Sequence, residues 1–144
     1  MGVGFVYRYT AQRVIARPTA EVFGYLADAT RQTEWVHGVS RCSWLGDGPA
    51  PGAVAEQTMT FLGKTRTVPM TVVEYQPERR VVFEKQEPMY IRFGFELEED
   101  GGSTLVRYPV EMGLRGVLGL LVRLVGHKEI EGDLTRIAQR LETP

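Results

Sequence analysis

The stretch "RPTAEVFGYLADATRQTEW", residues 17–35, decides the fold of this chain, because it interrupts a sequence that otherwise alternates like a sheet. It opens with features of a helix start. Pro18 suits a first helical turn, and Glu21 lies where the helix dipole favours a negative charge. Apolar side chains then recur at helical spacing, at Val22, Phe23 and Leu26. The pattern predicts a short helix with one buried side.

A second short helix is predicted directly after the first. Asp28 or Thr30 can cap it, it carries Trp35, and Gly38 is suited to end it. Two short helices in succession, ending on a tryptophan, are an unusual insertion in a sheet protein.

The segments on both sides of these helices have the composition and alternation of strands. One precedes the helices, at Tyr9–Ala16, and a long helical pattern closes the chain from about Leu114 to Leu141. Between them, period-two alternation indicates antiparallel strands with one solvated face. These predicted strands are Val39–Leu45, Ala53–Phe61, Thr65–Tyr75, Arg80–Lys85, Tyr90–Glu98 and Thr104–Met112. The fold class is therefore α+β, with a curved antiparallel sheet of about seven strands.

A strongly curved sheet and a single long helix leave a gap between them. The two short helices can close one end of that gap. We expect the remaining space to form an internal cavity, with Trp35 pointing toward its interior.

Length and composition place the chain in a broad class. Its 144 residues fit one domain, 1–144, with 43% hydrophobic and 24% charged residues, as in an ordinary globular protein. A net charge of −1 without a basic cluster argues against nucleic-acid binding. No signal peptide is recognised, and the longest apolar run, Gly116–Gly126, is too short to span a bilayer. We expect a soluble, cytoplasmic protein.

Metal, cofactor and cysteine chemistry find little support. His37 and His127 lie far apart in sequence, with no paired cysteines or HExxH motif, so neither a metal nor a cofactor is expected. Cys42, the single cysteine, fits a small buried hydrophobe better than a nucleophile. The Gly/Pro-rich loop Gly46–Gly52 is either a flap over the cavity mouth or a plain surface loop.

The closing helix allows two interpretations. Ile130, Leu134, Ile137 and Leu141 form a buried stripe. Continued backward on a straight helix, the stripe reaches His127 and Arg123, which would then project into the cavity and leave a leucine side free for a membrane or a partner. Alternatively, the helix shifts phase near Gly126, so that Leu118, Leu121 and Val125 face the cavity. We favour the second interpretation, because an exposed leucine stripe is a liability without a partner.

Acid–base catalysis has three candidate residues, Tyr108, Tyr90 and His127. Alternation directs Tyr108 inward together with Val106 and Val110, which makes it the best hydrogen-bond donor in the cavity. No carboxylate can be assigned an inward position from the pattern.

Five segments together resemble one known superfamily. They are "VIARPTAEVFGYLADATRQTEWVHGV", "PGAVAEQ", "VVEYQPERRVVFE", "EEDGGSTLVRYPVEM" and the closing helix. The chain resembles the START-like, helix-grip superfamily (SRPBCC) of polyketide cyclase/dehydrase and lipid-binding proteins. The most specific elements are the Ala-x-Pro-x-x-x-Val-Phe segment before Trp35 and the Tyr-x-Pro turn at Tyr75–Pro77. The resemblance implies a hydrophobic cavity whose contents differ between members, and no common catalytic motif.

The sequence thus predicts a domain that binds a small lipophilic ligand, such as a lipid, isoprenoid or polyketide, as a carrier or sensor. One alternative is a polyketide cyclase/aromatase or dehydratase that uses cavity tyrosine and histidine groups; a carboxylate or histidine beside a cavity tyrosine would favour it. Another is a dimerising interaction module, so both a monomer and a homodimer remain open, as does transient membrane contact. The predicted ligand-binding residues are Trp35, Met59, Phe61, Met70, Phe83, Tyr90, Phe93, Phe95, Tyr108, Met112, Leu118, Leu121 and Val125.

Overall fold

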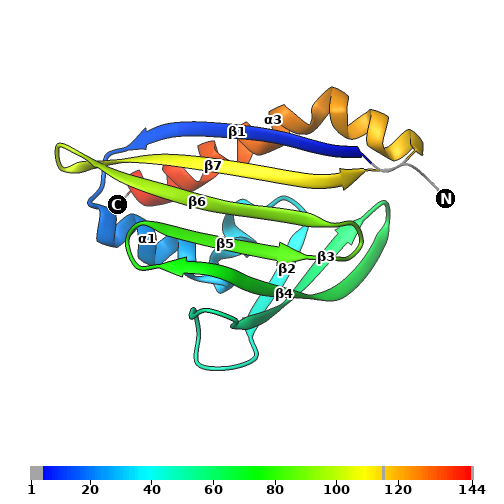
Figure 1. The fold of residues 1–144 in the computed structure, drawn as a ribbon, viewed down its shortest axis with the longest axis horizontal. Coiled ribbons are helices and arrows are strands. Elements are labelled where there is room, and N and C mark those ends of the chain that lie inside the picture. Colours follow the sequence, from blue (N-terminus) through cyan, green and yellow to red (C-terminus); the bar gives the residue numbers. More distant parts are fainter. Residues whose placement is uncertain (1–4, 115, 144) are drawn as a thin grey trace.

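The computed structural model describes residues 5–114 and 116–143 and shows the predicted α+β architecture (Figure 1). Strands and helices follow one another in the order expected from the sequence. The strands are β1 (Phe5–Ile15), β2 (Val39–Trp44), β3 (Val54–Phe61), β4 (Lys64–Gln76), β5 (Arg80–Lys85), β6 (Ile91–Asp100) and β7 (Ser103–Leu114). The helices are α1 (Thr19–Ala27), the 3-10 helix η1 (Ala29–Arg31), α2 (Gln32–Trp35) and α3 (Gly116–Glu142).

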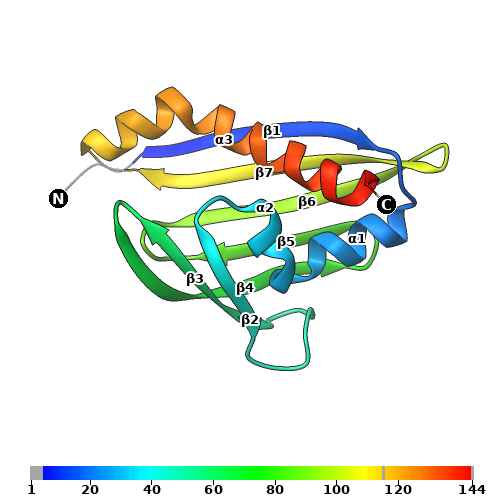
Figure 2. The same cartoon turned by 180° about the vertical axis from the view of Figure 1, so that it is seen from behind.

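The seven strands form one antiparallel sheet in the order β1-β7-β6-β5-β4-β3-β2. Chain-adjacent strands pair from β2 to β7, and β1 closes the sheet by pairing with β7. All helices lie on the same face of the sheet, and in Figure 2 α3 crosses in front of β1 and β7 while the short helices lie over the middle strands. This is the helix-grip fold, with the concave face turned toward the helices.

The stretch that follows β1 forms the predicted pair of short helices. The side chain of Asp28 accepts hydrogen bonds from the backbone N–H and the hydroxyl of Thr30, at 3.0 and 2.7 Å, and so caps the turn η1. The chain then reverses at Gly38, where φ is +89° and an added Cβ would lie 3.0 Å from the Thr60 carbonyl oxygen. The helices therefore end where only glycine fits easily.

Trp35 is the centre of an aromatic cluster between the helices and the sheet. Its side chain is 1% exposed and its ring packs edge-on against Phe93, Phe95 and Tyr108, with ring centroids 5.5 to 6.2 Å apart. This edge-to-face geometry is one of the two favoured for aromatic pairs. The position of Trp35 in the interior agrees with the prediction.

Helix α3 packs on the sheet through one continuous stripe, which differs from both sequence-based interpretations. The stripe Ile130, Leu134, Ile137 and Leu141 is buried, as predicted. It continues toward the N-terminus through the buried Gly126 and Gly119, whereas His127 and Arg123 are exposed. A Cβ on Gly126 would lie 3.1 Å from the Tyr7 ring, so the missing side chain allows α3 to approach β1 closely.

The leucine side of α3 consequently faces away from the sheet. Leu121 and Val125 are 53% and 52% exposed, as are the neighbouring Leu120 and Leu124 at 58% and 64%. Our expectation of a phase shift that buries Leu121 and Val125 is therefore wrong, because the helix remains in phase and uses glycines for contact. The side chain of Leu118 lies outside the part of the structure that is described.

Candidate functional site

A pocket of about 240 Å³ lies between the concave face of the sheet and the helices α2 and α3. Each wall comes from a different part of the chain, which folding brings together. The helical wall and its connection supply Trp35, Val36, His37, Glu129, Ile130 and Asp133. The sheet supplies Gln57, Met59, Phe61, Lys85, Ile91, Phe93, Tyr108, Val110 and Met112.

Six of the residues predicted to bind ligand line this pocket: Trp35, Met59, Phe61, Phe93, Tyr108 and Met112. They lie there because alternate strand residues face the concave side. Their role in binding stays a prediction. Met70, Phe83 and Phe95 are fully buried in the core without reaching the pocket lining.

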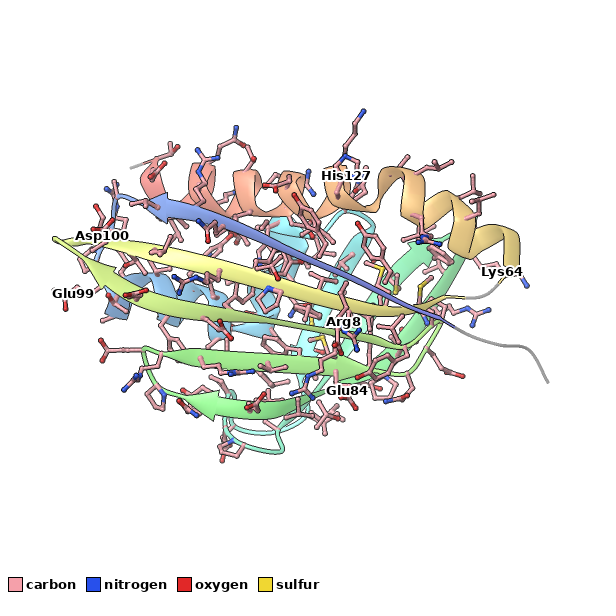
Figure 3. All side chains as sticks on the ribbon, turned by 45° about the horizontal axis from the view of Figure 1, so that its top comes forward. Arg8, Lys64, Glu84, Glu99, Asp100 and His127 are labelled. Atoms are coloured by element: carbon pink, nitrogen blue, oxygen red, sulfur yellow. The ribbon has the colours of Figure 1, made fainter. Side chains whose placement is uncertain are left out.

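The other predicted residues lie elsewhere. The Tyr90 hydroxyl donates to Glu84 at 3.3 Å, within a group of charges on the outer face of the sheet that includes Arg8 and Glu84 (Figure 3). His127 is exposed, and its ring lies 6.2 Å from that of Tyr9. Neither residue reaches the pocket, which leaves Tyr108 as the one pocket residue among the three acid–base candidates.

Tyr108 belongs to a chain of polar contacts on the pocket wall. Its hydroxyl donates a hydrogen bond of 2.8 Å to Oδ2 of Asp133 on α3. The guanidinium of Arg136 donates to the other oxygen, Oδ1, at 2.7 Å, and to the carbonyl oxygen of Trp35 at 2.9 Å. The Asp133 carboxylate is thus held in a fixed orientation by one donor on each oxygen.

Burial shifts the acid–base properties of this pair. It raises the pKa of Asp133 to about 6, although Tyr108 and Arg136 oppose the shift. It also raises the pKa of Tyr108 well above its usual value, and the adjacent Asp133 charge adds to this effect. Near neutral pH, the pair therefore combines a carboxylate able to accept a proton with a tyrosine that remains a donor.

A second polar group enters the pocket from the sheet. Lys85 ends β5 and is 5% exposed. Its ammonium donates to Oε1 of Gln57 at 2.6 Å and approaches the Met59 sulfur at 3.2 Å. The amide of Gln57 donates in turn to Oε1 of Gln32 at 2.8 Å. Burial lowers the pKa of Lys85 to about 8, because desolvation disfavours its charged form.

The sequence-based reasoning missed Asp133, Lys85 and Gln57. Asp133 lies three residues after Ile130 and four before Ile137, so it shares their buried face. Lys85 follows the inward Phe83 at a spacing of two, which places it on the same side of the sheet. Helical spacing and strand alternation alone would thus have predicted that Asp133 and Lys85 face inward, but charged side chains are rarely assigned to a protein interior. From the sequence pattern no carboxylate was assigned to the cavity, whereas the structure places Asp133 on its wall.

The structure gives no support for a cysteine nucleophile or a metal site among the described residues. Cys42 is buried and burial raises the pKa of its thiol to about 11, so the nucleophilic thiolate is disfavoured. Within the described residues, no cluster of three or more His, Cys, Asp or Glu side chains could hold a metal. The loop Gly46–Gly52 contributes no residue to the pocket lining. No helix in the described part of the chain is long and apolar enough to cross a bilayer.

Comparison with known proteins agrees with the fold. The profile of the family described as polyketide cyclase/dehydrase and lipid transport matches residues 7–143. No curated protein sequence matches the chain.

Solved structures share the fold at low sequence identity. The Zhui aromatase/cyclase from a Streptomyces species is 13% identical with a TM-score of 0.78, over 96% of this chain and 94% of that one. A START superfamily protein from Mycobacterium smegmatis is 15% identical with a TM-score of 0.78, over 94% and 97%. The di-domain ARO/CYC StfQ of the steffimycin biosynthetic pathway is 14% identical with a TM-score of 0.74, over 95% of this chain and 51% of that one. With the profile covering nearly its whole length, the chain belongs to the polyketide cyclase/dehydrase and lipid transport family.

Proposed function

We propose that this protein binds a small, largely apolar molecule in the pocket between the sheet and α3. The observation that carries the proposal is the pocket wall itself, in which aromatic, aliphatic and methionine side chains surround a few fixed polar groups. Ligand sites in proteins typically combine such an apolar lining with a small number of orienting polar contacts. Methionines at positions 59 and 112 add adaptable surface.

The size of the pocket limits the ligand. A volume of about 240 Å³ corresponds to roughly eight water molecules in the liquid, and thus to on the order of ten to fifteen non-hydrogen atoms of an organic molecule. A two-ring aromatic compound fits this range. A larger ligand requires displacement of side chains at the pocket rim.

Binding can be tested with 1-naphthylamine, a neutral two-ring probe whose fluorescence changes in an apolar environment and whose size suits the pocket. We expect saturable binding to the native protein. Met112→Trp should abolish it, because the larger side chain occupies the pocket that Met112 lines. The matched control is Val14→Trp, at an exposed position of β1. Equal binding by native protein and Met112→Trp, with both folded, would contradict the proposal.

A second candidate function is acid–base catalysis on the bound molecule, as in a cyclase or dehydratase. The observation that favours it is the pair Tyr108–Asp133 in the pocket, at 2.8 Å. A carrier needs no such pair. Asp133 can accept the proton from a carbon beside a ketone, and the carbonyl oxygen, which becomes the enolate oxygen, can then accept a hydrogen bond from Tyr108.

Proton abstraction can be measured separately from binding. With acetophenone in deuterated buffer, NMR follows the replacement of methyl protons by deuterium. We expect the native protein to accelerate this exchange and Asp133→Asn to remove the acceleration, while the neutral naphthylamine probe still binds. If exchange in the presence of native protein is no faster than in buffer, the catalytic alternative fails and the binding function stands.

A further inference from the structure

Lys85 occupies an unusual position for a lysine. It lies at the end of β5 on the concave face, and its side chain reaches across β4 to contact Gln57 and Met59 on β3. With 5% of its surface exposed, its ammonium is removed from bulk water, yet it belongs to the pocket lining. The group is therefore buried from solvent and accessible to a bound molecule.

The protein does not supply this ammonium with a counter-ion. An ammonium has three N–H donors, and its partners here are one amide oxygen at 2.6 Å and a thioether sulfur, which is a weak acceptor. Among the described residues, no carboxylate forms an ion pair with Lys85. A buried charge without a partner carries a substantial desolvation cost.

The two acidic residues of the pocket lining interact with other groups and not with Lys85. Asp133 is bound on one oxygen by Tyr108 and on the other by Arg136. Glu129 lies at the rim with 61% of its side chain exposed, 4.0 Å from His37. Neither neutralises Lys85, so the positive charge on the sheet wall remains uncompensated inside the pocket.

A second buried donor also lacks an acceptor. Within the described part of the chain, Nε1 of Trp35 is buried without a hydrogen-bond partner, and Trp35 lines the same pocket. Buried polar groups are normally paired, and a ligand is one way in which they become so. Two residues of the pocket lining, Lys85 and Trp35, thus carry donors that the protein does not fully satisfy, and a molecule with acceptor oxygens would complement them.

We propose that Lys85 anchors the carboxylate of the pocket ligand, so that the molecule bound is a small aryl or alkyl carboxylate with an apolar body. The carboxylate supplies the counter-charge that the protein does not give this ammonium, and it forms a charge-assisted hydrogen bond with it. The apolar body then lies against Ile91, Phe93 and Met112. This inference rests on the proposed binding function and adds the chemical class of the ligand.

The test compares 2-naphthoate with 2-naphthamide, two molecules of the same shape that differ in charge. Their affinities are measured at pH 7 by calorimetry and by displacement of the neutral naphthylamine probe. We expect the native protein to bind 2-naphthoate on the order of tenfold more tightly than 2-naphthamide. In Lys85→Met this ratio should fall to about one. Lys64→Met, which changes an exposed lysine near the tip of the β3–β4 hairpin, should keep the preference (Figure 3).

A second measurement needs no variant. The chain has only three lysines, Lys64, Lys85 and Lys128, so their side-chain NMR signals can be assigned individually. The Lys85 signal should shift on addition of 2-naphthoate and far less on addition of 2-naphthamide.

The outcomes separate this inference from the function on which it rests. If the neutral probe and 2-naphthamide bind but 2-naphthoate has no advantage, the role of Lys85 is refuted and the binding function stands. If the preference for 2-naphthoate survives in folded Lys85→Met, the anion binds elsewhere and the inference is likewise refuted. If neither the probe nor the two naphthalene compounds bind, the pocket is no ligand site and both proposals fail.

Discussion

Replacing Lys85 by methionine should change how the stability of the protein depends on pH. Burial lowers the pKa of Lys85 from 10.5 to about 8 in the folded state. At about 1.4 kcal/mol per pKa unit, holding this lysine charged in the fold costs about 3 kcal/mol. The cost is fully present below pH 8 and is lost as the pH rises from about 8 to 10.5, because over this range the unfolded chain binds more protons than the folded one.

The substitution has a second, pH-independent effect. Lys85→Met leaves Oε1 of Gln57 without its donor at 2.6 Å, and an unsatisfied buried acceptor costs about 1–3 kcal/mol. The net change at pH 7 is therefore small, since the two effects oppose each other. The informative quantity is the pH dependence of the difference between native protein and variant, in which the Gln57 contribution cancels.

The assay is urea unfolding of the native protein and Lys85→Met at intervals between pH 7 and 10.5. Relative to the variant, the native protein should gain about 3 kcal/mol in free energy of unfolding across this range. Lys64→Met, at an exposed position, serves as the control and should show no comparable trend. A difference between native protein and Lys85→Met that stays constant within about 0.5 kcal/mol would refute the reasoning that this ammonium is buried without a counter-charge.

Three further predictions concern other parts of the structure. Tyr108→Phe removes a hydrogen bond that lowers the pKa of Asp133, so this pKa should rise above its native value of about 6 in carboxyl NMR titration; an unchanged value would mean that the contact is absent in solution. Gly94→Ala should destabilise the fold by about 1–3 kcal/mol in urea unfolding, because its Cβ would lie 2.6 Å from a backbone oxygen. Gly24→Ala in α1 has open space around the added Cβ and should instead stabilise the fold by about 0.5–1 kcal/mol. Leu124→Gln should change stability by less than about 0.5 kcal/mol because Leu124 is 64% exposed; a loss of several kcal/mol would show that this side of α3 is covered in solution, and analytical ultracentrifugation would then test for a dimer.

Much of the architecture was readable from local sequence features. Alternation of apolar residues with period two located the strands, because opposite faces of a strand meet different environments. The helix-start signals around Pro18 and Asp28, followed by Gly38, located the short helices. The same period placed Tyr108 inward, as the structure confirms.

The sequence did not predict which side of the N-terminal half of α3 contacts the sheet, because two patterns in it pointed to different sides. Helical periodicity continued backward from Ile130 predicted that His127 faces the sheet. Hydrophobicity predicted instead that Leu121 and Val125 face it. The structure instead buries Gly126 and Gly119, whose small size permits contact with β1. A residue without a side chain gives no signal in a hydrophobic pattern, yet it can form the closest packing.

By itself, the sequence determined the strand and helix order, the antiparallel sheet, the inward position of Trp35 and the family. These depend on local propensity, periodicity and turn chemistry, which are properties of short segments. Only the tertiary structure decided which polar groups share the pocket. Tyr108 meets Asp133 across 25 positions and Lys85 meets Gln57 across 28, through sheet register and helix docking. Their chemistry also depends on burial, because exclusion of water raises the pKa of Asp133 and lowers that of Lys85, so that both lie closer to pH 7. Burial is a property of the whole fold and not of a short segment.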